Sequence, residues 1–433
     1  MKRIIKYLII AAGMITTSVT VAQNPAPAAK QSGSVLIMNV KAHIGNGKVI
    51  ENAVIGFDAG KLILVADATT VKLKKDSYAV VIDGYGKHAY PGLIACNTNI
   101  GLAEIDMVRS TLDYNEVGEM NPNIRSIISY NTDSKIIPTV RSNGVLMAEV
   151  SPRGGMISGT SSVVQLDAWN WEDAAVAMDK NMHMNWPRMY IYQGGGPESE
   201  ENQRQRMQRE LSVLEQYFNE AEAYCKQQKP QEVNVRFEAM RGLFDGTTKL
   251  FVHAGYVKEI EAAVLFAKKH TLKMVLVGGS DAWRVASLLK ENSVPVILGQ
   301  THALPPREDD DTDLPYKLPF LLHRAGVTCA ISIDGSWQER NLPFMAGTAA
   351  AFGLDKEQAL AMITAVPAQI LGVSSSAGTL EVDKDATLIL TPGDLLDMRS
   401  SVVEAAFIQG RTIDLDDAQK QLYRKYMNKY DLK

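Results

Sequence analysis

The chain has 433 residues, 46% of them hydrophobic and 22% charged, which is long enough for one large barrel or for two to three domains. Its 45 basic residues are offset by 49 acidic ones, giving a formal net charge of −4. This near balance gives no support to a nucleic-acid-binding protein.

The first residues have the pattern of a secretory signal. Basic side chains within 1–7 precede an apolar run at 8–15, and small residues follow as far as Ala22. The apolar run is too short for a stable membrane span, and no later stretch has that pattern. We therefore expect residues 1–22 to be cleaved near Ala22 and the mature protein to be periplasmic or secreted.

Both ends of the remaining chain carry β-strand signals. Residues 23–33 (QNPAPAAKQSG) have the composition of a disordered leader. Within 34–90, alternating apolar residues are separated by Asn-Gly and Ala-Gly turns, which favours short antiparallel strands. Residues 376–415 return to the same pattern. The sequence predicts one composite β-sandwich domain built from 34–90 plus 376–415.

Residues 91–375 alternate between apolar strands and helical patterns, as in KLFVHAG followed by YVKEIEAAVLFAKKH. Repeated strand-helix units indicate a parallel sheet, either open or closed, and this length suits a (β/α)8 barrel. A polar, charged segment at about 192–245 has helical spacing. We interpret it as a helical insertion, acting as a lid or as an excursion from the barrel.

Several motifs together resemble the amidohydrolase superfamily, in particular its imidazolonepropionase-like branch. They are PGLI at 91–94, NLPFMAGTAAAFGLDKEQAL at 341–360, ITAVPAQILGV at 363–373 and AGTLEVDKDATLIL at 377–390. The resemblance implies an α/β fold, a (β/α)8 TIM barrel flanked by the small β-domain. It also implies one or two divalent metals at the C-terminal mouth of the barrel, where a bound water attacks a C–N bond.

The motif residues of that family are only partly present. Its first-strand His-x-His is replaced by Asn97 and Asn99, and the strand KMVLVGGS offers Gly278 where a further His is expected. The resemblance implies His253 and Asp334 as the remaining catalytic residues, and as ligands only if a single metal is bound. Because zinc prefers imidazole, thiolate or carboxylate over an amide, we expect no binuclear centre, and either no metal or one weakly bound zinc.

The residues themselves leave alternatives open. Asn97 and Asn99 can bind a substrate or merely fill the vacated pocket with polar groups. His253 can be a ligand, an acid-base group or a hydrogen-bonded structural histidine. Asp334 ends a strand, as catalytic carboxylates of barrels do, but it can also cap a helix.

Loop residues supply the other candidates. Arg153 lies in the glycine-rich turn SPRGGMISG and is predicted to face a substrate. Asn115 and Glu116 lie in a polar loop after the first strand, which can line the site or be an ordinary long loop. His183 with Trp186, in NMHMNWPRMY, is predicted as loop packing. His302 is predicted as part of a surface turn.

Two functions fit these observations. The first is an exported hydrolase with a degenerate metal site that acts on a non-peptide or cyclic amide C–N bond of a small substrate. The alternative is a catalytically inactive paralogue that binds a small ligand or partners an active, metal-binding homologue. In either case the expected partners are a small molecule and a homo- or hetero-oligomer, with no nucleic acid and no membrane span.

Overall fold

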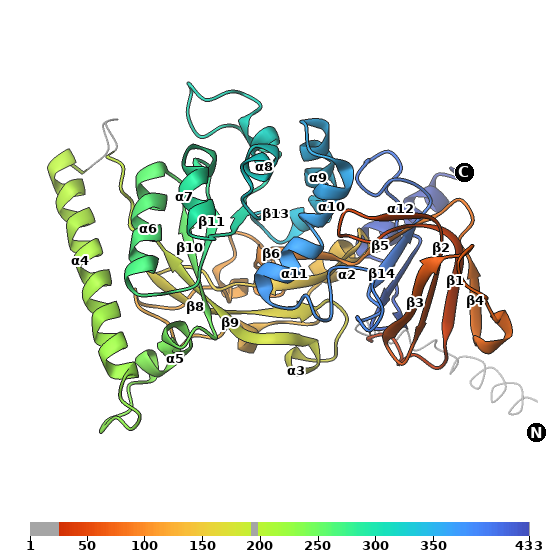
Figure 1. The fold of residues 1–433 in the computed structure, drawn as a ribbon, viewed down its shortest axis with the longest axis horizontal. Helices are drawn as coiled ribbons and strands as arrows, with labels where there is room; N and C mark the ends of the chain where they lie inside the picture. Colours follow the sequence, from red (N-terminus) through yellow and green to blue (C-terminus); the bar gives the residue numbers. More distant parts are fainter. Residues whose placement is uncertain (1–25, 192–197, 433) are drawn as a thin grey trace, which may run out of the picture.

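The computed structural model describes residues 26–191 and 198–432, which form a barrel and a separate β-sheet beside it (Figure 1). The predicted signal peptide, 1–22, lies outside the described residues. Within the described part, no helix combines the length and apolar character needed to cross a bilayer.

The barrel is one eight-stranded sheet whose strands neighbour one another in chain order. The strands are β6 (Leu93–Thr98), β7 (Val145–Val150), β8 (Ile157–Gln165), β9 (Ala175–Asn185), β10 (Lys249–Ala254), β11 (Met274–Gly278), β12 (Val296–Leu298) and β13 (Cys329–Ile331). All pairs are parallel except those of β8, which runs antiparallel to β7 and β9. The short 151–156 connection explains the exception, since a parallel crossover needs about a dozen residues or more.

The backbone at 362–363 closes the barrel between its first and last strands. Ile331 of β13 donates its N–H to the Met362 carbonyl at 3.1 Å, and Ile94 of β6 donates to the Ile363 carbonyl at 3.0 Å. The predicted TIM barrel is therefore confirmed, with one strand reversed.

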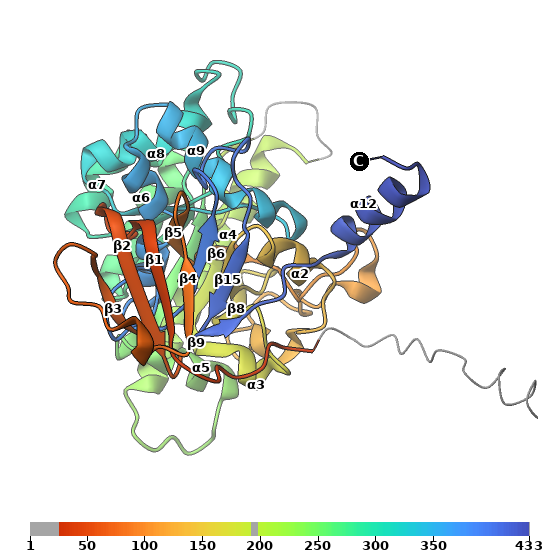
Figure 2. The ribbon, with the colours of Figure 1, turned by 90° about the vertical axis from the view of Figure 1, so that its right-hand side faces the viewer.

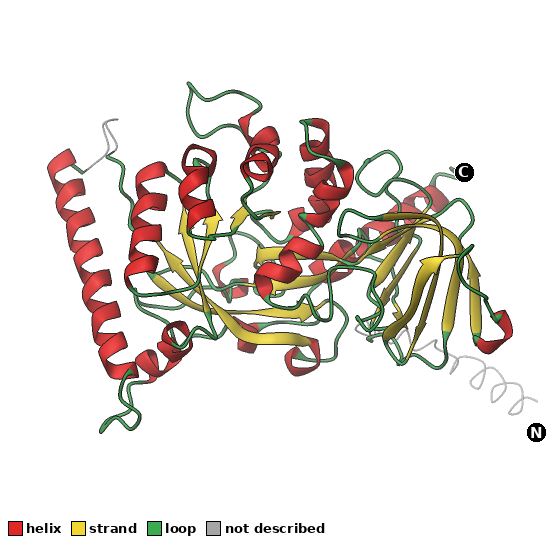
Figure 3. Ribbon diagram, viewed as in Figure 1, coloured by secondary structure: helices red, strands yellow, loops and turns green. Residues whose placement is uncertain are grey.

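Helices cover the outside of the barrel (Figure 3). They are α2 (Ile136–Arg141), α3 (Trp171–Ala174), α4 (Glu200–Cys225), α5 (Val235–Phe244), α6 (Val257–Lys269), α7 (Ala286–Glu291), α8 (Leu314–Ala325), α9 (Leu342–Ala351), α10 (Lys356–Ala361) and α11 (Ala365–Leu371). The described part of the 192–245 segment forms α4 and α5. Phe218 of α4 packs on Phe266 of α6 at 4.9 Å between ring centroids, so α4 lies in the outer helix layer and not across the barrel mouth (Figure 1).

The second sheet joins the two ends of the chain. It consists of β1 (Val35–His43), β2 (Val49–Asp58), β3 (Lys61–Asp67), β4 (Val80–Asp83) and β5 (His88–Pro91), together with β14 (Leu388–Thr391), β15 (Ala405–Ile408) and β16 (Arg411–Thr412). Antiparallel pairing of β5 with β14 makes one continuous mixed sheet in place of the two facing sheets expected of a sandwich. Apolar clusters cover both of its faces.

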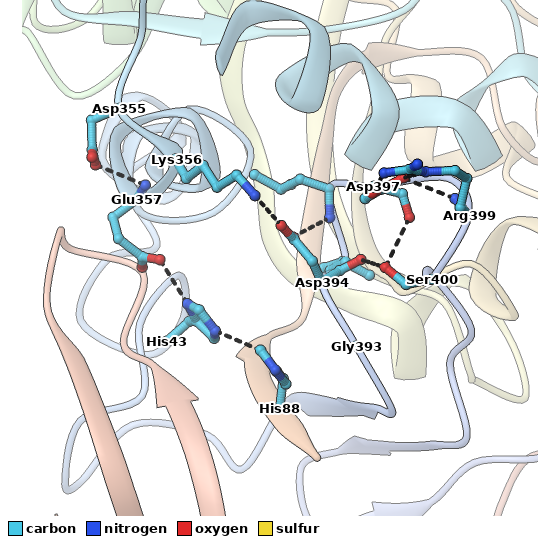
Figure 4. Close-up of polar contacts among 12 residues, drawn as sticks. His43, His88, Asp355, Lys356, Glu357, Gly393, Asp394, Asp397, Arg399 and Ser400 are labelled. Carbon is cyan, nitrogen blue, oxygen red and sulfur yellow. Dashed lines mark hydrogen bonds and ion pairs between the residues drawn. The ribbon is translucent and has the colours of Figure 1, made fainter. Parts of the chain in front are cut away.

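Figure 4 shows how this sheet is attached to the barrel. His43 of β1 lies between Glu357 of α10, 2.7 Å from Nδ1 to Oε1, and His88 of β5, 2.9 Å from Nε2 to Nδ1. The neighbouring Lys356 pairs with Asp394, beyond β14, at 2.5 Å. Two adjacent positions of α10 therefore hold the sheet in place.

The expectation of a disordered leader at 23–33 is wrong for its described part, 26–33. The Ala28 N–H donates to the Asp167 carboxylate at 3.0 Å, and the Gln31 side chain accepts from the Gly60 N–H at 2.8 Å. Composition could not indicate this order, because both partners are distant in the sequence.

At the other end, α12 (Ala418–Lys429) projects from the body and buries none of its residues (Figure 2). Its start is fixed to the barrel, where Ser142 donates to the Asp417 carboxylate at 2.8 Å and Thr139 donates to Gln419 at 2.7 Å. The C-terminus is therefore anchored through the N-terminal end of the helix.

Asp167 connects the barrel with both chain ends. Its carboxylate accepts from Arg141 of α2 and from Arg411 of β16, each at 2.5 Å, as well as from Ala28. The Asp167 side chain is 4% exposed. Removing this charge leaves two largely buried guanidinium groups without their shared partner.

We therefore predict that Asp167→Asn lowers the free energy of unfolding by about 3–5 kcal/mol, as breaking a buried ion pair from one side does. Chemical denaturation measures the loss. Asp76→Asn, an exposed carboxylate on a 3-10 helix, is the control and should change stability little. A loss for Asp167→Asn no larger than that of the control would contradict the assigned role.

Candidate functional site

A cavity of about 590 Å³ opens at the C-terminal ends of β6, β10, β11, β12 and β13. Four of the residues expected at the site line it: Asn97, Arg153, His253 and Asp334. Its other walls carry aromatic and apolar groups, among them Trp186, Tyr190, Tyr256, Leu298, Leu314 and Leu318. The cavity has the size and mixed lining of a small-molecule site.

The remaining expected residues lie off the cavity wall. Asn99 follows β6, and its buried Oδ1 has no hydrogen-bond partner among the described residues. Asn115 is exposed and contacts the backbone near Gly154, while the exposed Glu116 accepts a hydrogen bond from the N–H of its neighbour Val117. Asn115 and Glu116 are placed beside the turn that carries Arg153, without reaching the cavity.

Asn97 has a left-handed backbone at the end of β6, with φ of +52°. Asparagine adopts this conformation more readily than most residues. The turned backbone aims the Asn97 N–H at Glu149 Oε2, 3.0 Å away, and offers the Asn97 carbonyl to Arg153 at 2.8 Å. Asn97 therefore shapes the site through its backbone as well as through its amide.

Glu149 of β7 is the charged group directly beneath the cavity, and it is 0% exposed. Besides Asn97, it accepts from Ser161 at 2.6 Å, Asn181 at 3.3 Å and His183 Nε2 at 3.2 Å. Burial by itself would raise the pKa of Glu149, but these hydrogen bonds outweigh it and hold the pKa below its usual value. The carboxylate is thus ionised inside the barrel.

His183 connects this carboxylate with the cavity. It lies on β9, is 0% exposed, and places its Nδ1 2.9 Å from His253 Nε2 on β10. Parallel pairing sets Phe251 opposite His183 and His253 opposite Asn185. The two histidines therefore lie on adjacent strands, offset by two residues in register. Burial, together with the nearby charge of Arg153, holds the pKa of His253 well below its usual value, so its ring is neutral.

Arg153 and Asp334 face each other across the cavity mouth. Their closest nitrogen and oxygen are 3.4 Å apart, and their side chains are 23% and 85% exposed. A pair this exposed and this long contributes little stability. Both groups therefore stay available to a ligand.

Glu339, on the 3-10 helix η5 (Trp337–Asn341), is a second buried carboxyl near this site. Neither of its oxygens has a hydrogen-bond partner among the described residues. Burial raises the pKa of Glu339 well above its usual value, and the Thr98 hydroxyl and the Arg153 charge offset this only in part. Burial therefore shifts the pKa of Glu339 upward, whereas hydrogen bonds hold the pKa of Glu149 down.

Sequence reasoning missed Glu149, Ser161, Asn181 and Glu339, and it assigned His183 to loop packing, which is wrong. A signal was available for two of them. Glu149 interrupts the apolar run VLMAEV, and His183 alternates with Met182 and Met184 in NMHMN, which is a strand pattern. His302, which follows β12, forms a hydrogen bond between its Nε2 and the Thr348 hydroxyl at 2.6 Å.

The described strand ends at the barrel mouth carry few of the side chains that commonly hold a pair of divalent metals. In the described ranges, no group of three or more His, Cys, Asp or Glu side chains is arranged to hold a metal ion. Asn97 and Asn99 offer amide oxygens, and β11 ends at Gly278, which has no side chain to act as a ligand. The imidazoles of His183 and His253 are hydrogen-bonded to each other. Amide oxygens are poor zinc ligands in comparison with imidazole and carboxylate.

One family model matches part of the chain. Residues 219–413 match the model of the amidohydrolase family. No match was found among curated proteins.

Several solved structures share the fold of this chain. An amidohydrolase from Thermotoga maritima MSB8 has a TM-score of 0.74 at 21% identity, over 88% of this chain and 99% of that chain. A molinate hydrolase has a TM-score of 0.55 at 13% identity, over 89% and 96%. A zinc-bound adenosine deaminase from Xanthomonas campestris has a TM-score of 0.51 at 15% identity, over 94% and 99%. At these identities the likeness establishes the shared fold.

The buried Glu339 carboxyl gives a pH prediction. Its folded-state pKa is raised, so the protonated form stabilises the fold at low pH, and this contribution is lost as pH rises from about the usual 4.5 through the folded pKa. The loss approaches about 1.4 kcal/mol per pH unit in that window. Glu339→Gln cannot ionise, so its stability relative to the wild type should rise with pH.

Denaturation of both proteins from pH 4 to pH 8 measures the difference. Glu261→Gln, an exposed change on α6, is the control and should give a difference that does not vary with pH. A pH-independent difference for Glu339→Gln as well would show that this carboxyl ionises normally in the folded protein.

Proposed function

We propose that this amidohydrolase-family protein hydrolyses a non-peptide or cyclic amide C–N bond of a small substrate held in the barrel-mouth cavity. The observation that carries the proposal is the shared cavity. It brings His253, Arg153 and Asp334 together at the strand ends where barrel enzymes keep their catalytic groups.

Hydrolysis of an amide requires a group that stabilises the negative charge on the carbonyl oxygen. Arg153 supplies a guanidinium on the cavity wall, and its hydrogen bond to the Asn97 carbonyl fixes its position. Asp334 is the residue that the family resemblance gives as the base. Its 85% exposure and its contact with Arg153 suit it better to orienting Arg153 or the substrate, which leaves the neutral His253 as the proton acceptor.

The proposal also covers where the protein acts and which branch of the superfamily it resembles. The predicted signal peptide supports export to the periplasm or the medium, where the substrate would be met. The imidazolonepropionase-like motifs support a small cyclic or dipeptide-like substrate. Among the similar structures is an Xaa-Pro dipeptidase with bound methionine, at a TM-score of 0.55 and 12% identity over 88% of this chain.

A second function is favoured by the mismatch between the side chains and a metal pair. A relative that has lost its metals can keep a polar cavity for binding a small ligand, or for pairing with an active homologue, without turnover. On this alternative Arg153 and Asp334 hold the ligand, and no bond is broken.

Turnover of a panel of N-acyl amino acids, cyclic imides and Xaa-Pro dipeptides by purified protein tests these functions. We predict hydrolysis of at least one compound, and a fall in kcat/KM of about 100-fold or more for Arg153→Gln, the cost of losing one group that stabilises the oxyanion. Arg399→Gln, far from the cavity with a side chain 86% exposed, is the matched control. Thermal stabilisation by a panel compound that is recovered intact, with no turnover of any, would establish the binding function instead.

Metal content gives an independent prediction. After dialysis against zinc and then against metal-free buffer, elemental analysis should find far less than one zinc per chain, because the strand ends offer amides and glycine where a metal needs imidazole. The double variant Asn97→His with Asn99→His should retain more zinc than the wild type. Two zinc ions retained per wild-type chain would contradict this prediction.

A further inference from the structure

Glu149, His183 and His253 form one continuous hydrogen-bonded chain from the barrel interior to the cavity wall. Glu149 Oε1 lies 3.2 Å from His183 Nε2, and His183 Nδ1 lies 2.9 Å from His253 Nε2. Glu149 and His183 are both 0% exposed, whereas His253 lines the cavity.

The contacts of Glu149 decide where the protons sit. Its oxygens already accept from the Ser161 hydroxyl, the Asn181 amide and the Asn97 N–H, so an ionised carboxylate is the state these donors satisfy. His183 Nε2 then donates to Glu149, because a lone pair facing a carboxylate would be repelled.

With its proton on Nε2, His183 presents its Nδ1 as an acceptor. The proton between the two rings therefore belongs to His253 Nε2, which donates to His183 Nδ1 across the 2.9 Å contact. His253 Nδ1 is left with a lone pair. No group among the described residues makes a hydrogen bond to it.

We propose that Glu149, His183 and His253 act as a fixed proton relay that replaces the metal centre and makes His253 Nδ1 a metal-independent proton acceptor for whatever occupies the cavity. His253 is the catalytic residue, and Glu149 and His183 are positioning residues. Only the hydrolytic step of this inference rests on the proposed function. In a protein that binds without turnover, His253 Nδ1 would instead select a ligand that carries a hydrogen-bond donor.

The proton balance of the step is simple. A water gives one proton to His253 Nδ1, and its oxygen adds to the substrate carbonyl carbon, whose oxyanion faces Arg153. The His253 imidazolium then carries a charge that Glu149 balances through His183. As the C–N bond breaks, that proton moves from His253 Nδ1 to the leaving nitrogen, so water and the amide become an acid and an amine.

The protonation state of His253 can be measured without any substrate. The chain has only seven histidines, so protein labelled with ¹⁵N-histidine gives few imidazole signals, which single His→Asn variants assign. We expect His253 to carry its proton on Nε2, with Nδ1 unprotonated between pH 6 and pH 8. A proton found on Nδ1, as a doubly protonated His183 would require, overturns the relay.

Activity tests the relay separately, with the compounds of the hydrolysis panel as substrates. Glu149→Gln keeps the shape of the side chain but removes the charge, so kcat should fall by about 100-fold or more with little change in KM, and the pH profile of kcat should change shape. EDTA should leave the wild-type rate unchanged. His323→Asn, on the exposed surface of α8, is the control.

The failures can be told apart. Turnover that EDTA abolishes, or a Glu149→Gln variant that keeps the wild-type kcat and pH profile, overturns the relay and leaves the hydrolase proposal standing. No turnover of any panel compound, with His253 Nδ1 unprotonated, removes the hydrolytic step and supports the same nitrogen as a ligand-recognition group. If Glu149→Gln fails to fold, His183→Gln serves in its place, and the wild-type histidine spectrum alone remains able to overturn the relay.

Discussion

A single buried negative charge organises the barrel mouth. Glu149 lies beneath the cavity without solvent, and it is stable there because four groups from three other strands donate to it. Each of those bonds also fixes its donor, so the Asn97 backbone, Ser161, Asn181 and His183 are held in register with one another. Loss of the Glu149 side chain would leave all four donors without their acceptor in the buried interior, where an unpaired polar group is costly.

The negative charge of Glu149 orders the barrel mouth through hydrogen bonds to its neighbours. The neighbouring Glu339 shows the opposite outcome: a carboxyl that is buried without such donors has its pKa raised.

The fold supports this site through contacts that join distant parts of the chain. The backbone at 362–363 closes the barrel, Asp167 joins α2 to β16 and to Ala28, and α10 holds the composite sheet through His43 and Asp394. Both chain ends are therefore tied to the barrel wall. The reversed β8 contributes to the site directly, since its Ser161 faces Glu149.

The sequence by itself determined the class of fold, since strand-helix alternation and flanking turn-rich strands are local patterns that a single chain displays. It also indicated Arg153 through its glycine-rich turn, and the family resemblance indicated His253 and Asp334; the structure places all three on the wall of one cavity. It could not place Asn115 and Glu116, whose loop has no periodicity to orient it, and it gave the wrong environment for His183. Only the tertiary structure decided that Glu149, His183 and His253 form one chain of hydrogen bonds. Hydrogen bonding across β7, β9 and β10 depends on strand register. Register is set by packing of the whole barrel, and no local pattern encodes it.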